Sequence, residues 1–480
     1  MTTMAAKGIA TGARIATGVV TLAVAGGVVA AALLLPLPGV EATPASFSVE
    51  PQAAEQVRAC AGPLVRLSDD SGQDATAISR VGTADVVTGT SPEAQLDVTP
   101  LASPDDRAST DDTAPSRVAL PVPDTGSPDA TLFAAAQSQT ISSGELVGLA
   151  ATSCGEASSE SWLVAGSTTV GRTSFVVLAN PGDVPAVVDL TVYGDLGAIE
   201  APGGRNIDVP ARSTRILSLA GLAPDLATPV IHVEASVGAV SAAVQQSVVR
   251  GLEPGGVELV GPSAPPATVQ RVAGVQISGT SSIAERLSDS DNSDLQSVLR
   301  LFVPGTEPAS VTLRVAEERT GGASTDYQVG LTPGIVTEFP LQDIPDGTYS
   351  VEAESDQPIV MGARTSTLVN GVTDFAWYQT LDELGTDFVV ATADGPNPRL
   401  HLVNTTDADV EVTVTENGGE TQSYTFVPGA RSVALKAGSS YTVSASGPVS
   451  AMVDYLGEGR SSAFAIAPPS PDASPLVIYP

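Results

Sequence analysis

The two histidines, His232 and His401, are the side chains best suited to proton transfer near neutral pH. Each lies between two apolar residues in a segment typical of a β-strand. Because alternate strand residues face opposite ways, both histidines are predicted to face solvent rather than the core. No motif for a Ser or Cys nucleophile accompanies either of them. The sequence therefore predicts no catalytic residue, and we expect a protein that is not an enzyme.

An acidic run at residues 288–294 places carboxylate and amide oxygens at alternate positions, as a hard cation requires. The run departs from a calcium-binding EF-hand loop. Counted from Asp289, the sixth position is Asp294, where Gly is required, and the twelfth is Arg300, where a bidentate Glu belongs. We therefore expect a solvated loop here. No metal site and no cofactor are predicted elsewhere, since neither cysteine has a second Cys or a His at ligand spacing.

Two adjacent aromatic residues, Trp377 and Tyr378, are the candidates for a ligand-binding face. Adjacent strand residues face opposite ways, so one of the two should point outward unless the strand is buried on both sides. Core packing is the simpler interpretation for Trp162, which precedes an apolar strand segment.

The amino-terminal part of the chain predicts export. Residues 15–35 carry no charge and are long enough, at about 1.5 Å per residue, to span a bilayer core of roughly 30 Å. The flanking cations, Lys7 and Arg14, lie on the amino side, so residues 1–14 should remain cytoplasmic. We expect a single-pass cell-membrane protein with most of its chain extracytoplasmic. Cleavage of this segment as a signal peptide remains an alternative.

In an oxidising compartment, the chain's two cysteines, Cys60 and Cys154, are predicted to form one disulfide. Residues 36–130 are rich in Pro, Ser, Thr and Asp and read as a spacer, interrupted by a strand around Cys60. A second apolar segment at 131–154 is also typical of strands.

From residue 155 onward the chain contains an internal repeat. Three segments begin with an apolar strand and continue with apolar residues at every second position, at 188, 190 and 192, at 311, 313 and 315, and at 410, 412 and 414. This period indicates strands with one buried face. The prediction is an all-β fold of three tandem immunoglobulin-like antiparallel β-sandwiches, at 131–265, 266–380 and 381–468, followed by a Pro-rich tail at 469–480.

The charge balance limits the possible partners. A formal net charge of -32 opposes association with nucleic acid. The expected partners are therefore the membrane, which residues 15–35 would contact, and an envelope protein or polysaccharide.

The chain resembles a family of uncharacterised, membrane-anchored exported proteins of actinobacteria, often encoded beside a large glycosyltransferase. The residues that carry the likeness are Cys60-Ala-Gly-Pro-Leu64, Ser153-Cys154, Trp162-Leu-Val-Ala-Gly166, Leu178-Ala-Asn-Pro-Gly182 and Thr191-Val-Tyr-Gly194. The resemblance implies a cell-envelope setting and no particular reaction.

The leading hypothesis is a non-catalytic envelope protein whose β-sandwiches present a surface for protein or polysaccharide contact. A carbohydrate-binding accessory to an envelope glycosyltransferase is one alternative. An unrecognised hydrolase, which would need a pocket that brings one histidine close to acidic residues, is the other.

Overall fold

The computed structural model of the protein describes residues 24, 47–49, 55–67, 78–105, 114–121, 131–142, 144–319, 321–468 and 476–478. These residues are predominantly β-strands, so the predicted all-β class is confirmed. No helix within the described part of the chain is long and apolar enough to cross a membrane. The predicted membrane segment at 15–35 lies outside the described residues, apart from Val24.

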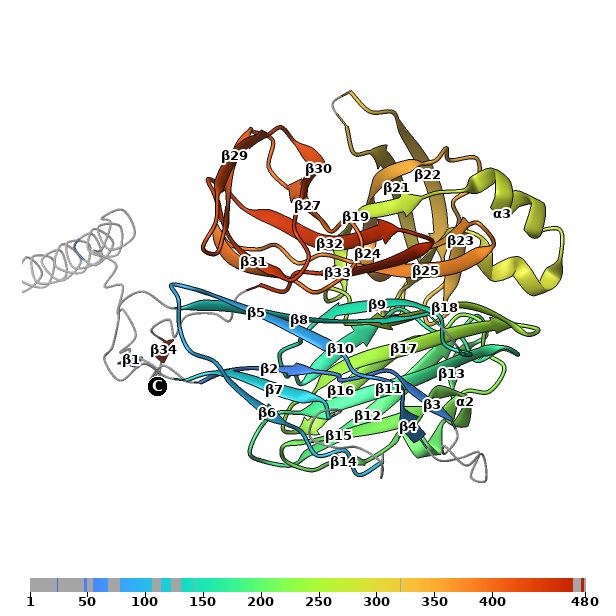
Figure 1. Ribbon diagram of the computed structural model, residues 1–480, viewed down its shortest axis with the longest axis horizontal. Helices are drawn as coiled ribbons and strands as arrows, with labels where there is room; N and C mark the ends of the chain where they lie inside the picture. The colour runs from blue at the N-terminus through green and yellow to red at the C-terminus, as the bar shows by residue number, and fades with distance from the viewer. Residues whose placement is uncertain are drawn as a thin grey trace, which may run out of the picture. The chain divides into compact units, whose positions relative to one another are not determined.

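Repeat 1, which comprises β10 to β18, consists of two sheets around one core (Figure 1). One sheet has the order β10-β16-β12-β13 with β14 also beside β12, and the other has the order β15-β11-β17-β18. The strands are β10 (Glu160–Leu163), β11 (Arg172–Asn180), β12 (Ala186–Gly194), β13 (Gly197–Ile199), β14 (Ile207–Val209), β15 (Ser213–Ser218), β16 (Val230–Val237), β17 (Ser241–Arg250) and β18 (Glu253–Val260). Two short helices, η2 (Pro202–Gly204) and α2 (Leu219–Leu222), complete this repeat.

Repeat 2, which comprises β19 to β25, is organised around the 23-residue strand β24. The first half of β24 pairs with β19 and β21, and its second half pairs with β20 and β25. One strand thus contributes to both sheets. The elements are β19 (Ala267–Ile277), α3 (Thr280–Arg286), η3 (Ser290–Leu295), β20 (Val298–Phe302), β21 (Ala309–Glu317), β22 (Ser324–Leu331), β23 (Thr337–Pro340), β24 (Gly347–Val369) and β25 (Val372–Gln379).

Repeat 3, which comprises β26 to β33, has sheet orders β26-β31-β28-β29 and β30-β27-β32-β33. These orders match those of repeat 1, except that β29 alone lies where repeat 1 has both β13 and β14 beside β12. A shared strand order is the pattern that the internal sequence repeat predicts. The strands are β26 (Asp387–Thr392), β27 (Arg399–Asn404), β28 (Val410–Glu416), β29 (Thr421–Phe426), β30 (Gly429–Ala434), β31 (Ser439–Ala445), β32 (Val449–Gly457) and β33 (Arg460–Ala465).

The period-two strands lie as predicted. Apolar residues are buried at alternate positions along β12, β21 and β28, with partly or fully exposed residues between them. The first strand of each repeat behaves differently. In β11, β20 and β27 almost every residue is buried, because these strands are covered on both faces.

The interpretation of residues 36–130 as a spacer is wrong for its described parts. They form β2 (Gln56–Cys60), β3 (Val65–Leu67), β4 (Ile78–Arg80), β5 (Asp85–Ser91), β6 (Asp97–Pro100) and β7 (Ser116–Leu120). β2 pairs with β7, and β5 pairs with β8 (Leu132–Ile141), which pairs with β9 (Gly148–Ser153). Leu64, Leu101 and Val118 are buried. A few apolar residues at strand positions are enough to order this polar segment against the repeats.

Residues 53–472 form one unit by their contacts, and residues 1–52 with 473–480 form another. In the second unit, β1 (Phe47–Val49) pairs antiparallel with β34 (Leu476–Ile478). The three repeats therefore belong to a single body, because neighbouring repeats share buried surface. Phe375 and Trp377 of β25 lie in the core of repeat 1, for example.

Candidate functional site

The predicted disulfide between Cys60 and Cys154 is confirmed, and both cysteines are buried. Next to the bridge, the amide of Ala59 donates to the carbonyl of Gly155 at 2.8 Å, and the amide of Gly155 donates back at 3.0 Å. Arg58 forms an ion pair with Glu156 at 2.9 Å. The bridge thus fixes the segment between β9 and β10 against β2.

Trp377 and Tyr378 do not form an exposed ligand face, because their side chains are 1% and 0% exposed. Trp377 packs in the core of repeat 1, where its indole N–H donates to Gln246 at 2.8 Å. Tyr378 faces the opposite way, into the core of repeat 2. The strand is buried on both sides, which is the one arrangement that hides both rings.

The prediction that His401 faces solvent is wrong, since the residue is 0% exposed. Its Nδ1 lies 2.6 Å from Glu318 and its Nε2 lies 2.7 Å from Asp454. Burial alone lowers the pKa of His401, but the two carboxylates outweigh it and raise the pKa to about 10. An imidazolium held between two carboxylates is a structural tie between repeats 2 and 3. With a pKa of about 10, it keeps its proton near neutral pH and is not suited to proton transfer there.

A glycine makes room for this histidine. Gly274 has φ of +67°, and a Cβ there would lie 2.7 Å from the His401 ring. The left-handed backbone and the close approach of the ring both require a residue without a side chain.

His232 lies at a surface that is only partly exposed. Its ring stacks on Trp162 with centroids 4.1 Å apart, and its Nε2 lies 2.9 Å from a carboxylate oxygen of Glu160. The same oxygen of Glu160 accepts a hydrogen bond from the indole of Trp162 at 3.3 Å. One histidine therefore does lie beside an acidic residue, at the edge of the pocket described below.

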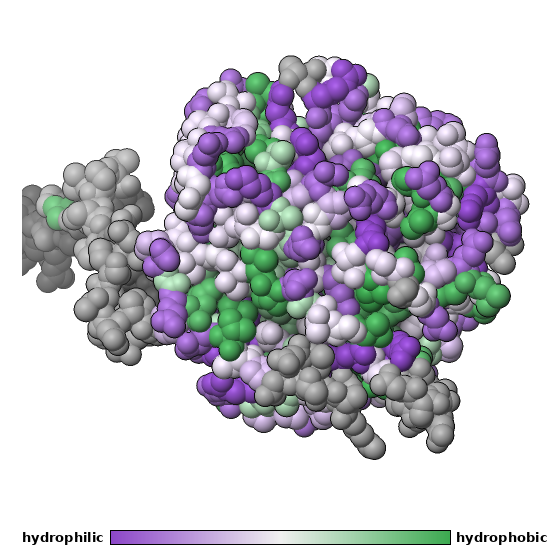
Figure 2. Space-filling model, viewed as in Figure 1, coloured by the Kyte–Doolittle hydropathy of each residue, from purple (hydrophilic) through white to green (hydrophobic). Residues whose placement is uncertain are grey.

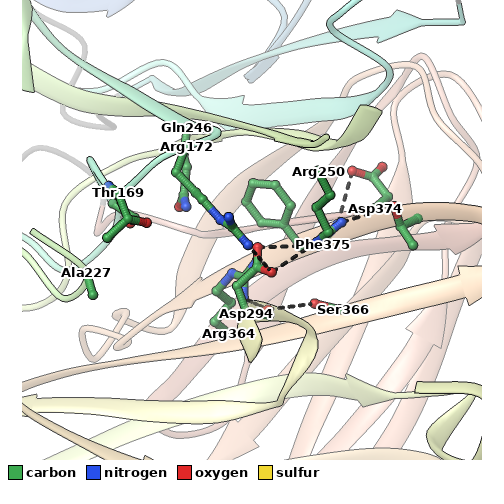
Figure 3. A network of polar contacts seen from close by, with 12 residues as sticks. Thr169, Arg172, Ala227, Gln246, Arg250, Asp294, Arg364, Ser366, Asp374 and Phe375 are labelled. Carbon is green, nitrogen blue, oxygen red and sulfur yellow. Dashed lines mark hydrogen bonds and ion pairs between the residues drawn. The ribbon is translucent and has the colours of Figure 1, made fainter. Parts of the chain in front are cut away.

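The acidic run is exposed at Ser288, Asp289 and Ser293, as we expected, but residues 290–295 form the short helix η3 and the Asp294 side chain is only 19% exposed. The last residue of the run, Asp294 in η3, forms ion pairs with Arg172 of β11 at 2.7 Å and with Arg250 of β17 at 2.9 Å. Arg364 of β24 also contacts it (Figure 3). Burial alone raises the pKa of Asp294, but Arg364 and Arg250 outweigh it and hold the pKa at about 2. Since β11 and β17 belong to repeat 1 and β24 to repeat 2, this cluster ties the two repeats together.

Asp374 of β25 is a second buried carboxylate with a structural role. One of its oxygens accepts the amides of Val257 and Phe375, and the other accepts those of Leu149 and Ser461, all at 3.0 to 3.2 Å. The four donors come from β18, β25, β9 and β33. A single carboxylate thereby joins the three repeats and the amino-terminal strands.

A cavity of about 300 Å³, here called the junction pocket, lies where these parts meet. The two connections between repeats, β18 to β19 and β25 to β26, form part of its wall, together with the ends of β9 and β33 and the start of β10. Its lining residues are Thr152, Ser153, Gly155, Glu156, Ser158, Glu160, Ser161, Trp162, Gly261, Pro262, Ser263, Pro265, Pro266, Gln379, Thr380, Asp382, Phe464, Ala465, Ile466 and Ala467.

Three buried polar groups in this wall make no hydrogen bond with any residue that the structure describes. They are the hydroxyl of Thr152, the side-chain amide nitrogen of Gln379 and the hydroxyl of Thr380. A buried polar group without a partner costs about 1–3 kcal/mol, so three of them in one wall are expensive to maintain. The protein itself provides no reason to keep them there.

The pocket is electrically one-sided. Glu156, Glu160 and Asp382 line it, and no Lys, Arg or His is among the described residues of its wall. Asp382 makes no hydrogen bond or ion pair with the described residues, and burial raises its pKa. Among the described residues, no group of three His, Cys, Asp or Glu side chains is arranged to hold a metal ion.

No motif in the sequence indicated this pocket. Residues 262–266 read as a linker, and the Thr and Gln residues of the wall are unremarkable in strands. Only the Pro-rich composition at the boundary between repeats indicated a connection of fixed shape.

The chain belongs to DUF5719, described as a family of unknown function, whose match covers residues 108–446. No curated protein matches the sequence.

Proposed function

We propose that the protein is a non-catalytic, exported cell-envelope protein whose three immunoglobulin-like modules present one rigid surface for contact with an envelope protein or polysaccharide. The anchor in this proposal is the segment 15–35, with the bulk of the chain outside the cytoplasmic membrane.

The observation that carries the proposal is that buried charged groups are used to fix the repeats together. Arg300 of repeat 2 donates to the carbonyls of Gly166 and Pro229 of repeat 1 at 3.1 and 2.9 Å, and its guanidinium lies 4.6 Å from the centre of the Trp377 ring. The clusters around Asp294 and His401 act in the same way. Strong ties between modules suit a protein that must present a fixed surface rather than bend around a substrate.

The disulfide supports an oxidising compartment, since such bridges persist mainly outside the cytoplasm. The surface is consistent with a soluble, strongly acidic body. Figure 2 shows hydrophilic side chains spread over the face in view, with hydrophobic ones in small separate patches. A net charge of -32 disfavours anionic partners and favours neutral or basic ones.

A second candidate, a carbohydrate-binding accessory protein, is favoured by the junction pocket. Recessed sites at domain junctions that combine apolar walls with a few polar groups are typical of ligand-binding proteins. The first candidate needs only the outer surface, whereas the second needs this pocket.

The proposal is tested by cosedimenting the purified full chain with isolated envelopes of its native cells. We expect the chain to sediment with the envelopes and to release no product from purified cell-wall polysaccharide. Turnover of that polysaccharide, abolished by one substitution at Glu160 or His232, would overturn the non-catalytic assignment in favour of a hydrolase.

A further inference from the structure

We infer that the junction pocket binds a saccharide unit that carries no negative charge, and this inference rests on the proposed contact function. It identifies the pocket, rather than the outer faces of the sheets, as the place where a glycan is recognised.

The unpartnered groups provide the first argument. Thr152, Gln379 and Thr380 are 3%, 2% and 1% exposed, come from two different strands and the connection after one of them, and are all among the residues that line the cavity. The side-chain oxygen of Gln379 accepts a hydrogen bond from the amide of Ala465 at 3.1 Å, so the NH₂ group of the same side chain is held in a fixed orientation. A ligand with several hydroxyl groups supplies both donors and acceptors, and can therefore satisfy two hydroxyls and an amide at once.

The walls provide the second argument. The pocket combines these polar groups with the apolar surfaces of Trp162, Pro262, Pro265 and Phe464. A sugar ring has the matching character, because its C–H groups pack against apolar surface while its hydroxyls hydrogen-bond. The volume of about 300 Å³ is at the lower end of small-molecule pockets, which suits one or two sugar units rather than a long buried chain.

Charge selects among saccharides. The lining has three carboxyl side chains, of which Glu156 is paired with Arg58 and Glu160 lies beside His232, so that Asp382 is the one without a basic partner among the described residues. No Lys, Arg or His of the described wall itself is placed to neutralise a phosphate or uronate. An anionic sugar would face Asp382 in a partly buried setting, where repulsion is poorly screened. A neutral sugar avoids this cost, and an amino sugar gains from it.

The pocket is formed before any ligand binds. The amide of Ser263 donates to the backbone carbonyl of Trp162 at 2.9 Å, and the amide of Ala264 donates to the backbone carbonyl of Thr380 at 3.2 Å. These two hydrogen bonds hold the first connection between repeats against the opposite wall. The disulfide at Cys154 holds the third side. A preformed site loses little entropy on binding, which favours recognition of small ligands.

The test uses the full chain in a detergent without a sugar headgroup, titrated calorimetrically with glucose, galactose, mannose, N-acetylglucosamine and glucosamine. Glucose 6-phosphate and glucuronate are the anionic counterparts. We expect at least one of the first group to bind and both anionic sugars to bind at least about 10-fold more weakly. Absence of binding by all five, or equal binding of the anionic sugars, would overturn the proposal.

Two substitutions locate the site. The double variant Thr152→Val and Thr380→Val removes two unpartnered hydroxyls and is expected to weaken binding about 10-fold or more, at about one net hydrogen bond each. Its thermal midpoint should be unchanged or higher, because no protein hydrogen bond is lost. The matched control is Thr228→Val, which removes another buried, unpartnered hydroxyl outside the pocket and should leave binding unchanged. Equal weakening by the control would contradict the assignment.

Cosedimentation with native envelopes separates this inference from the contact function. Equal cosedimentation of the wild type and the double variant, with no sugar binding by either, would reject the pocket proposal and leave the contact function standing. Sugar binding without cosedimentation would reject the contact function and leave the pocket proposal standing.

Discussion

Asp294→Asn is the most informative perturbation of the ties between repeats, because it removes one charge while keeping the shape of the side chain. Asp294 contacts Arg172, Arg250 and Arg364 in the cluster of Figure 3, and its side chain is 19% exposed. Without its charge, three largely buried guanidinium groups lose their common partner.

The magnitude follows from the pKa. A value of about 2 lies roughly two units below the ordinary value for Asp, and at 1.36 kcal/mol per unit this corresponds to about 2.5 kcal/mol. Breaking a buried ion pair on one side typically costs about 3–5 kcal/mol. We therefore expect Asp294→Asn to lower the free energy of unfolding by about 3 kcal/mol at pH 7.

The assay is guanidinium denaturation followed by tryptophan fluorescence at pH 7 and at pH 2.5. Because the folded pKa is depressed, the stabilisation is complete above the unfolded pKa near 4 and is lost as pH falls toward 2. The difference between variant and wild type should therefore shrink at the lower pH.

Asp183→Asn is the matched control. Asp183 pairs with Arg212 at 2.6 Å, closer than any of the three arginines lies to the carboxylate oxygens of Asp294, but it is 74% exposed. Solvent screening should leave its removal without measurable effect. Equal destabilisation by the two substitutions, or a loss for Asp294→Asn that does not change with pH, would refute the view that burial gives this cluster its strength.

Three further predictions concern the other ties. Cys154→Ser opens a loop with a sequence separation of 94 and is expected to cost about 4–5 kcal/mol, measured by denaturation against the wild type; an equal effect of a reducing agent on the variant would contradict it. The pKa of His401 is about 10 in the folded chain and about 6.5 in the unfolded chain, so its contribution to the free energy of unfolding should be complete below pH 6.5 and should decline as pH rises toward 10. In His401→Gln this decline should be smaller. A wild-type protein whose stability does not decline over this range would exclude the buried imidazolium. Asp374→Ala leaves four amide groups without an acceptor and should cost more than about 3 kcal/mol, whereas retention of wild-type stability would show that these hydrogen bonds contribute little.

Part of the fold could be predicted from the sequence because strand periodicity is a local property. Val188, Leu190 and Val192 alternate with polar residues, and the structure buries them as that alternation requires. The disulfide was predictable for a different reason, since two cysteines in an exported chain allow a single pairing. The strands within 78–105 were missed because their sequence is polar, and they are ordered by the sheets against which they pack.

The candidate site could not be predicted, because its parts are far apart in the chain. Thr152 and Thr380 are ordinary strand and connection residues until the repeats bring them to one cavity. Trp377 and Tyr378 were wrongly predicted to form a ligand-binding face for a related reason. Two adjacent aromatic residues in a strand expose one ring only when one face of the strand is open to solvent, and the sequence does not show whether it is.

The sequence by itself determined the strands, their threefold recurrence and the cysteine pair, because each depends on residue type and short spacing. Tertiary structure alone decided which faces of those strands meet solvent. His401 lies between two leucines and Asp294 ends an acidic run, yet the first is buried and the second largely so. Charged side chains from another repeat, together with one from their own, compensate their charge. Such compensation requires the assembled body, and so does the pocket that it encloses.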